Sequence, residues 1–283
     1  MKICFTTTLI ADSTLMKDTV GEFIPFNTKN YEFILFTNVP NYTHKSWKVI
    51  YIEDKVLNKY ANCENVIKDD GNVLNPSPAS KEKIKKIMKN NVYKSRYFKF
   101  MGWKYIKEKL NIDYDVIFYC DAIYSPNANK DWNTLAKKIL ESKCGFLQKL
   151  HPLKPDPYIE CFNCVRCGKD SGESMDKMKQ FLISTNTKKG VRIYENSSFG
   201  YNPKNKIITD AYSDFWNIYI KNKFTYRDQP LWGHICQKHN LSAVKEQNIH
   251  TNVIHKPTPP DSPYYFIFTG KNFNRSRTYK HLM

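Results

Sequence analysis

The sequence lacks the short motifs that mark the most common nucleotide and hydrolase sites. No Gly-x-Gly-x-x-Gly, no Walker loop and no Gly-x-Ser-x-Gly elbow occurs in its 283 residues. Each of these motifs builds a turn whose backbone cradles a phosphate or exposes a nucleophile. Their absence weakens the case for a dehydrogenase, a P-loop NTPase and a hydrolase of the nucleophile-elbow type.

Long apolar runs and linkers are missing as well. No stretch approaches the roughly 18 apolar residues that cross a bilayer, and Ile3-Cys4-Phe5 runs at once into Thr6-Thr7-Thr8, which leaves no apolar core for a secretory signal. No Gly/Ser linker, internal repeat or composition break divides the chain. We therefore expect one domain over residues 1–258 and a tail over 259–283, in a cytoplasmic protein with no transmembrane segment.

The eight cysteines are expected to be reduced, because several lie in apolar runs where a thiol packs as a small hydrophobe. Cys161, Cys164 and Cys167 are spaced three residues apart, which suits either a metal cluster or one face of a helix. A closed zinc site needs four ligands, and an iron–sulfur run would want a fourth cysteine where the chain has Ser171. The helix face is the favoured interpretation.

Basic residues outnumber acidic ones, with a formal net charge of +17. Residues 81–110 hold ten lysines and one arginine against two glutamates, a local charge of +9. Nucleic acid, an acidic membrane or a phosphate-bearing small substrate would each suit this charge. The whole chain is rich in Lys, Asn, Ile and Tyr, as an AT-rich genome would encode, so part of the basicity is compositional. A nucleic-acid partner is kept only as an alternative.

Apolar runs and helical periodicity alternate along the chain, which predicts an α/β fold: a mostly parallel central sheet flanked by helices. Short runs bounded by polar or turn residues predict strands at residues 2–8, 32–38, 47–53, 115–120 and 144–150. Helical patterns are expected from residue 81 onward and over 92–110, 132–142, 173–184, 208–222 and 229–239.

The stretch DYDVIFYCDAIYSPN, residues 113–127, ends an apolar strand on the carboxylate Asp121. Ligands of open α/β sheets bind at the carboxyl ends of the strands, so Asp121 is a candidate site residue. The alternative is that Asp121 only caps the turn that leads to Ser125-Pro126-Asn127.

The stretch TYRDQPLWGHI, residues 225–235, places Arg227, Asp228 and Gln229 before Pro230 at a predicted helix start. A planar arginine suits phosphate or carboxylate, and an aspartate beside an amide suits sugar hydroxyls. Simple capping would use Asp228 alone and leave its two neighbours unexplained.

Two further stretches hold candidate ligands. His255 is followed by Lys256 near the end of the predicted domain, where an imidazole could complete a cation site and the lysine could neutralise phosphate. His151 and Lys154 come just after a predicted strand end, which makes them candidates for substrate contact.

Put in order, these motifs resemble a family of glycosyltransferase-like domains from plant mucilage-related, bacterial and viral proteins, formerly a domain of unknown function. The family pattern runs from a Thr-rich first strand to an Arg-Asp-Gln helix start. The matching residues here are Thr6-Thr7, Phe36-Thr37-Asn38, Trp47, Arg96 with Lys99, Asp121-Ala122, His151-Pro152, Glu195-Asn196 and Arg227-Asp228-Gln229.

The resemblance implies a single GT-A-like, Rossmann-like domain that transfers a hexose or pentose from a UDP- or GDP-sugar to a glycan or glycoprotein. It implies catalytic roles for Arg227, Asp228 and Gln229, and a Mn²⁺ or Mg²⁺ ion held by Asp121 and His255. It further implies donor contacts by Thr6, Thr7, Arg96, Lys99, Asp121 and Lys256, and substrate contacts by His151, Lys154, Glu195 and Asn196.

The chain departs from the GT-A pattern at one position. Where an Asp-x-Asp motif would have its second carboxylate, this sequence has Ile123. One carboxylate and one imidazole bind Mg²⁺ weakly unless donor phosphates add oxygens. Two alternatives to a transferase are a non-catalytic nucleic-acid-binding protein that uses residues 81–110 and a hydrolase on a related scaffold.

Overall fold

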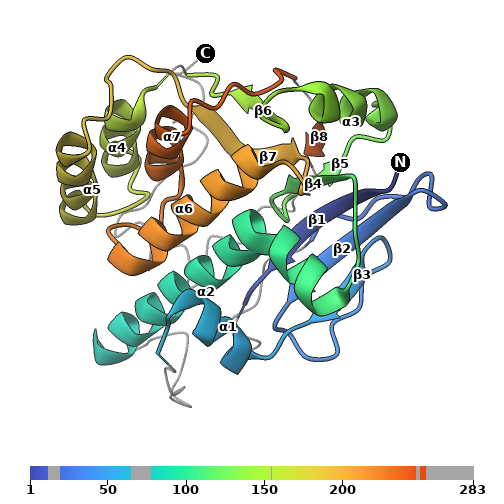
Figure 1. The fold of residues 1–283 in the computed structure, drawn as a ribbon. Helices are drawn as coiled ribbons and strands as arrows, with labels where there is room; N and C mark the ends of the chain where they lie inside the picture. Colours follow the sequence, from blue (N-terminus) through green and yellow to red (C-terminus); the bar gives the residue numbers. More distant parts are fainter. Residues whose placement is uncertain (12–19, 65–77, 154, 247–248, 253–283) are drawn as a thin grey trace.

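A six-stranded sheet forms the centre of the protein in the computed structural model (Figure 1). The structure describes residues 1–11, 20–64, 78–153, 155–246 and 249–252, with backbone alone at 78–85 and 251–252. Across the sheet the strands are β3 (Lys48–Tyr51), β2 (Tyr31–Thr37), β1 (Ile3–Leu9), β4 (Val116–Cys120), β7 (Tyr194–Tyr201) and β6 (Phe146–Leu150).

The sheet is mostly parallel, which confirms the sequence prediction. β1 pairs in parallel with both β2 and β4, and β2 pairs in parallel with β3. Only β7 runs the other way, between β4 and β6. As a result the carboxyl ends of β1, β2, β4 and β6 and the start of β7 share one edge of the sheet, called the C-terminal rim below.

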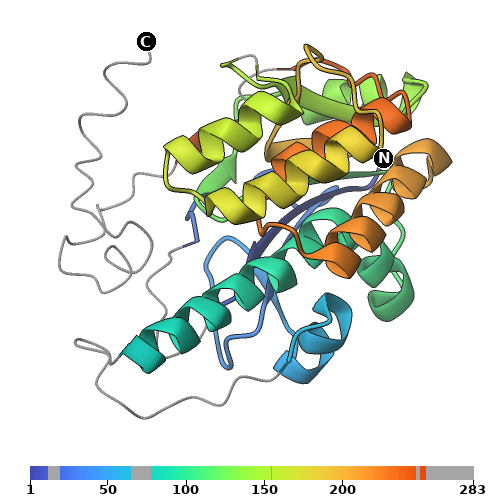
Figure 2. The same ribbon diagram turned by 90° about the vertical axis from the view of Figure 1, so that its left-hand side faces the viewer.

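Helices cover both faces of the sheet. One face packs against α2 and the helices that follow β6, and the other packs against α3 (Figures 1 and 2). The α-helices are α1 (Asp54–Ala61), α2 (Pro78–Tyr105), α3 (Trp132–Glu141), α4 (Pro157–Arg166), α5 (Gly172–Ser184), α6 (Lys206–Asn222) and α7 (Gln229–Lys238). Within the described part of the chain, no helix is long and apolar enough to span a membrane.

The predicted strands all form, each within two residues of its expected ends, but several elements were not predicted. β7 was missed because its first half, Glu195 to Ser198, is polar. α1 and a two-stranded sheet of β5 (Tyr124–Pro126) with β8 (His250–Asn252) were also missed. α4 contains Cys161 and Cys164, for which a helix face was the favoured interpretation. The helices expected from 81 and over 92–110 form one helix, α2, which continues into a π-helical turn at Ile106–Leu110.

Candidate active site

Asp121 lies at the C-terminal rim, directly after β4. Its backbone N–H donates to the carbonyl of Ser197 (2.8 Å), and its carbonyl accepts from the N–H of Tyr124 (2.8 Å). These bonds fix the turn through the backbone. The carboxylate is therefore left for other contacts, contrary to the capping alternative.

The Asp121 carboxylate contacts two side chains through one oxygen. Oδ1 accepts from Nζ of Lys99 (3.1 Å) and from the hydroxyl of Tyr119 (2.9 Å). The Tyr119 hydroxyl also lies 3.3 Å from Oγ1 of Thr8 on β1. Among the described contacts, the other oxygen of Asp121, Oδ2, is left to bind a ligand. The side chain of Asp121 is 32% exposed, so a ligand can reach this oxygen.

Two cations and a second carboxylate complete a charged network behind Asp121. Nζ of Lys99 is 3.2 Å from Oδ2 of Asp228. Nε of Arg96 is 2.9 Å from the same oxygen, but this ion pair does not have the geometry of a hydrogen bond. Arg96 and Lys99 are three residues apart on α2, so they share a face of this helix. The side chains of Lys99 and Asp228 are only 2% and 5% exposed, so this end of the network is inside the protein.

Asp228 is the N-cap residue of α7, yet its side chain makes no capping hydrogen bond. The simple capping interpretation is therefore wrong. Burial alone would raise the pKa of Asp228, but the neighbouring charges of Arg96, Lys99 and Arg227 outweigh it and hold this pKa below its usual range. The carboxylate is ionised and serves as the counter-charge of these cations.

Amide side chains lie beside the network on β7 and α7, which are in contact. Asn196 and Gln229 are both buried, and their amide nitrogens, Nδ2 and Nε2, have no hydrogen-bond partner among the described residues. Nε of Arg227 is also buried without a hydrogen-bond partner among the described residues. A buried donor without an acceptor costs free energy, so these groups are suited to a ligand that brings oxygens.

Gln148 on β6 holds this region together and was not predicted from the sequence. It is fully buried; its Nε2 donates to Oδ1 of Asn196 (3.0 Å) and to the carbonyl of Glu195 (2.8 Å), and its Oε1 accepts from Nε1 of Trp232 (3.0 Å). A glutamine directly after the apolar pair Phe146-Leu147, within a predicted strand, is the signal that could have revealed it. Glu195 is partly exposed, accepts from Ser197 Oγ and pairs with Lys149 (3.4 Å).

The remaining predicted site residues are Thr6, Thr7, His151, Lys154, His255 and Lys256, and they differ in burial and in whether the structure describes them. Thr6 and Thr7 are buried within β1, with Oγ1 of Thr6 directed at the carbonyl of Phe118 (3.4 Å). His151 follows β6 at the rim, and burial lowers the pKa of its imidazole. Lys154, His255 and Lys256 lie outside the described residues.

His250 on β8 contacts the central sheet at β7. It was not predicted, whereas His255 was predicted as a metal ligand. Nδ1 of His250 is 2.6 Å from Oγ of Ser198, and its ring centroid is 4.1 Å from that of Tyr124. Burial lowers the pKa of His250, which favours the neutral form of the ring. His250 lies five residues before His255 in the sequence.

The described residues do not by themselves fit a divalent cation. Nowhere in the described ranges do three His, Cys, Asp or Glu side chains lie close enough together to hold a metal ion. Asp121 offers one oxygen, and its other oxygen already contacts the ammonium of Lys99. A metal cluster at Cys161, Cys164 and Cys167 is not supported either, since Cys161 and Cys164 are buried free thiols on α4.

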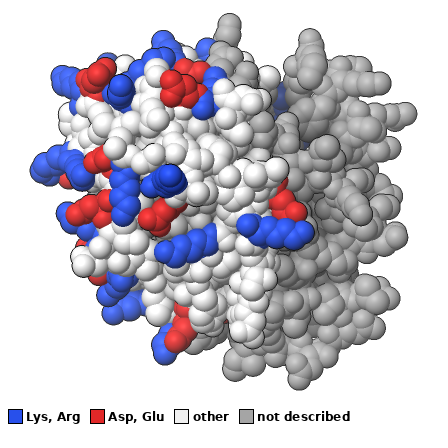
Figure 3. Space-filling view, turned by 90° about the vertical axis from the view of Figure 1, so that its right-hand side faces the viewer, with Lys and Arg blue, Asp and Glu red and all other residues white. Residues whose placement is uncertain are grey.

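Five of the eight lysine and arginine side chains at residues 86–110, where the side chains of the basic segment 81–110 are described, lie in ion pairs. On the face seen in Figure 3, acidic groups lie among the basic ones. Within the segment, ion pairs to carboxylates engage Lys86, Lys94, Arg96, Lys99 and Lys104. This pairing weakens the nucleic-acid alternative.

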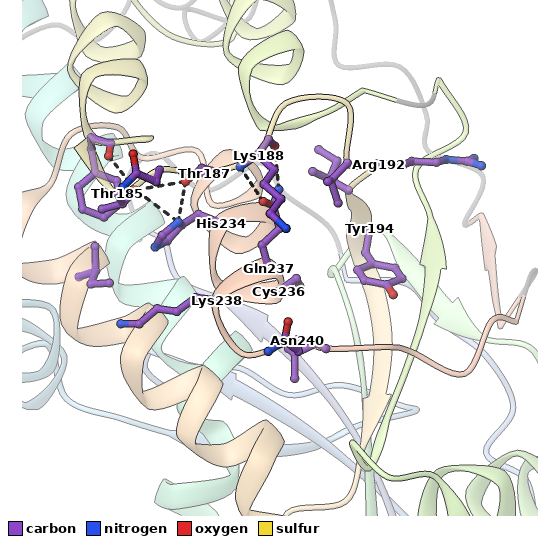
Figure 4. Close-up of a pocket in the computed structure, with 17 residues that line it drawn as sticks. Thr185, Thr187, Lys188, Arg192, Tyr194, His234, Cys236, Gln237, Lys238 and Asn240 are labelled. Carbon is purple, nitrogen blue, oxygen red and sulfur yellow. Dashed lines mark hydrogen bonds between the residues drawn. The ribbon is translucent and has the colours of Figure 1, made fainter. Parts of the chain in front are cut away.

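A separate hollow of about 810 Å³ lies between α5, α7 and the start of β7 (Figure 4). Two of its three lysine and arginine side chains are engaged elsewhere, because Arg192 donates to the carbonyl of His151 and Lys238 pairs with Asp214 (2.8 Å). It contains none of the predicted site residues, so the C-terminal rim is the better candidate site.

Comparisons with known proteins give a likeness of fold. No family model and no curated protein matches the sequence. The structure is similar to that of mouse xyloside xylosyltransferase 1 in its apo form, with a TM-score of 0.41 and 10% identity over 87% of this chain and 85% of that one. A likeness at this level assigns no residue a role.

Proposed function

We propose that this protein is a glycosyltransferase that moves a sugar from a nucleotide-sugar donor, a UDP- or GDP-sugar, to a glycan or glycoprotein acceptor. The observation that carries the proposal is the charged network of Arg96, Lys99, Asp121 and Asp228 at the C-terminal rim. The order of motifs that resembles the glycosyltransferase-like family supports the same conclusion.

The reaction exchanges one bond at the anomeric carbon of the sugar. The acceptor hydroxyl oxygen bonds to this carbon, the bond to the phosphate oxygen breaks, and its electron pair leaves with the nucleoside diphosphate. Fixed cations close to the leaving group stabilise the charge that develops there. Arg96 and Lys99 are the cations that the described network offers.

The acceptor must also lose its hydroxyl proton. Glu195 is a candidate acceptor for this proton, because its carboxylate is partly exposed at the start of β7 and lies 3.4 Å from the ammonium of Lys149. The amide donors of Asn196 and Gln229, which have no partner among the described residues, would bind sugar hydroxyls or phosphate oxygens.

We assign Asp228 a positioning role. Its carboxylate is buried between cations, so it holds Arg96 and Lys99 in place rather than facing the anomeric carbon. Asp121, at the exposed end of the network, is the carboxylate that can touch the donor or a cation bound to it. A Mn²⁺ or Mg²⁺ ion at Asp121 and His255 stays a prediction, and no step above depends on it.

The test measures release of nucleoside diphosphate from a panel of UDP- and GDP-sugars, with and without a mixture of glycan acceptors, in Mn²⁺ and in EDTA. We expect one donor to be consumed faster when the right acceptor is present. Equal turnover without any acceptor would indicate the hydrolase alternative. If no donor is consumed and none raises the melting temperature, the proposal is overturned; a ligand at 100 times its dissociation constant stabilises by about 2.7 kcal/mol.

A further inference from the structure

An apolar stripe lies on the outer face of α4, away from the candidate site. Ile159, Phe162 and Val165 are 50%, 58% and 40% exposed, and they recur at spacings of three residues, on one side of the helix. α4 and α5 lie side by side on the face turned to the viewer in Figure 2. Single exposed apolar residues are ordinary, but a contiguous row marks an interaction surface.

Cations flank the stripe at both ends. The guanidinium of Arg166 lies 6.0 Å from the ring centroid of Phe162, and the ammonium of Lys189 lies 5.4 Å from that of Tyr158. Lys169 is also exposed, just beyond the helix.

The acidic residues of this region are turned inward or paired. Asp156 caps α4 and Glu160 packs inside, and both are buried. On the neighbouring α5, Glu173 pairs with Lys177 and Asp176 pairs with Lys179. The exposed surface of α4 is thus apolar and positive, with no exposed carboxylate on its described residues.

We propose that this surface, made of Ile159, Phe162, Val165 and the flanking Arg166 and Lys189, docks onto an anionic lipid bilayer. A surface helix with an apolar stripe and basic borders inserts its apolar side chains between lipid headgroups, and anionic lipids attract its cations. A second copy of the chain fits less well, because two such surfaces would bring their arginines and lysines together in a protein of net charge +17. The docking uses no residue of the proposed transferase site and is independent of that function.

The experiment is vesicle flotation of the full chain with phosphatidylcholine alone or mixed in equal amounts with phosphatidylserine. We expect binding to the mixed vesicles only, weakened by salt. The double variant Ile159→Ser with Phe162→Ser should bind roughly tenfold less or worse, with an unchanged circular dichroism spectrum. The matched control replaces two exposed isoleucines outside the stripe, Ile24→Ser with Ile183→Ser, and should bind as the wild type does.

Two double variants that remove positive charge test the role of the cations beside the stripe. Arg166→Gln with Lys189→Gln should bind less and lose part of the salt dependence, whereas Lys177→Gln with Lys179→Gln, whose cations are paired, should change little. The proposal is overturned if the wild type does not float with the mixed vesicles, if neutral vesicles bind it equally, or if the stripe variant floats as the wild type does. A dimer in solution that the stripe variant converts to monomer would assign the surface to a second copy instead.

Discussion

The ammonium of Lys99 lies 3.2 Å from the carboxylate of Asp228, and both side chains are almost completely buried. Charges removed from water lose their hydration, and a buried ion pair persists only when the partners compensate each other. Here one ammonium contacts two carboxylates, Asp121 and Asp228, and Asp228 in turn contacts Arg96. The network ties α2 to the end of β4 and to the start of α7, so the loss of one member disturbs the others.

Asp228→Asn tests the buried end of this network. The variant keeps the shape of the side chain but leaves Arg96 and Lys99 with only Asp121 as a counter-charge. Removing one partner from a buried ion pair costs about 3 kcal/mol or more, so we expect a loss of that size in the free energy of unfolding, measured in urea at neutral pH. The control is Asp214→Asn, which disturbs a partly exposed pair with Lys238 and should cost less than about 1 kcal/mol. Equal small losses in both variants would contradict the role given to Asp228.

The pH dependence of the free energy of unfolding of Asp228→Asn gives an independent measure of what the charge of Asp228 contributes. The pKa of Asp228 is lowered in the folded state, so its stabilisation is present above the pKa of an unfolded aspartate, about 3.9, and is lost as the pH falls through the lower, folded value. The stability difference between the wild type and Asp228→Asn should therefore stay constant from neutral pH to about pH 5 and shrink progressively below it. A difference that does not change in acid would mean that the charge of Asp228 is not what stabilises the fold.

Asp121→Asn tests the exposed end of the network. Lys99 keeps Asp228 as a partner and Asp121 is one-third exposed, so stability should fall by only about 1 kcal/mol. Turnover of the nucleotide sugar should fall roughly a hundredfold, the scale of losing one charged contact to the reacting groups. The measurement is the initial rate of nucleoside diphosphate release at saturating donor.

The matched control for Asp121 is Asp115→Asn, a partly exposed carboxylate paired with Lys204 at the other end of the same strand. It should retain near-normal turnover. Binding gives a readout of the predicted cation that does not depend on catalysis. UDP should raise the melting temperature of the wild type more in Mn²⁺ than in EDTA, and Asp121→Asn should abolish that difference. A variant with normal turnover would remove Asp121 from the site.

The sequence predicted the rim but not the network. Asp121 could be placed because a strand as apolar as Val116 to Cys120 must be buried, and the residue that ends it must then lie at an edge. The contact between Lys99 and Asp228 could not be predicted, because it depends on how α2 and α7 pack, and no local pattern encodes that. β7 was missed for a related reason. Its polar residues have weak strand propensity, and their neighbours in the sheet, β4 and β6, provide the hydrogen bonds that make them a strand.

Stability should also depend on pH near neutrality through His234. This imidazole is buried on α7, with Nδ1 2.7 Å from Oγ1 of Thr187, and burial lowers its pKa. The unfolded chain then binds a proton that the folded protein does not, so the free energy of unfolding should fall as the pH drops below about 6.5. His234→Gln should lose less stability than the wild type between pH 7 and pH 5, measured by urea denaturation, because it lacks this proton linkage. His151 and His250 have lowered pKa values as well, so part of the decline should persist in the variant.

Gln148→Leu tests the amide that joins β6, β7 and α7. Leucine is close to glutamine in size but cannot bond to the indole N–H of Trp232, the carbonyl of Glu195 or the amide oxygen of Asn196. Each buried group left without a partner costs about 1 to 3 kcal/mol, so we expect a loss of at least about 2 kcal/mol in the free energy of unfolding. Gln180→Leu on the exposed side of α5 is the control and should change stability by less than about 0.5 kcal/mol. Because Asn196 would also lose the contact that orients its amide, donor affinity should fall in Gln148→Leu and not in the control. Equal stability and equal affinity in the two variants would show that Gln148 fills space without holding the site.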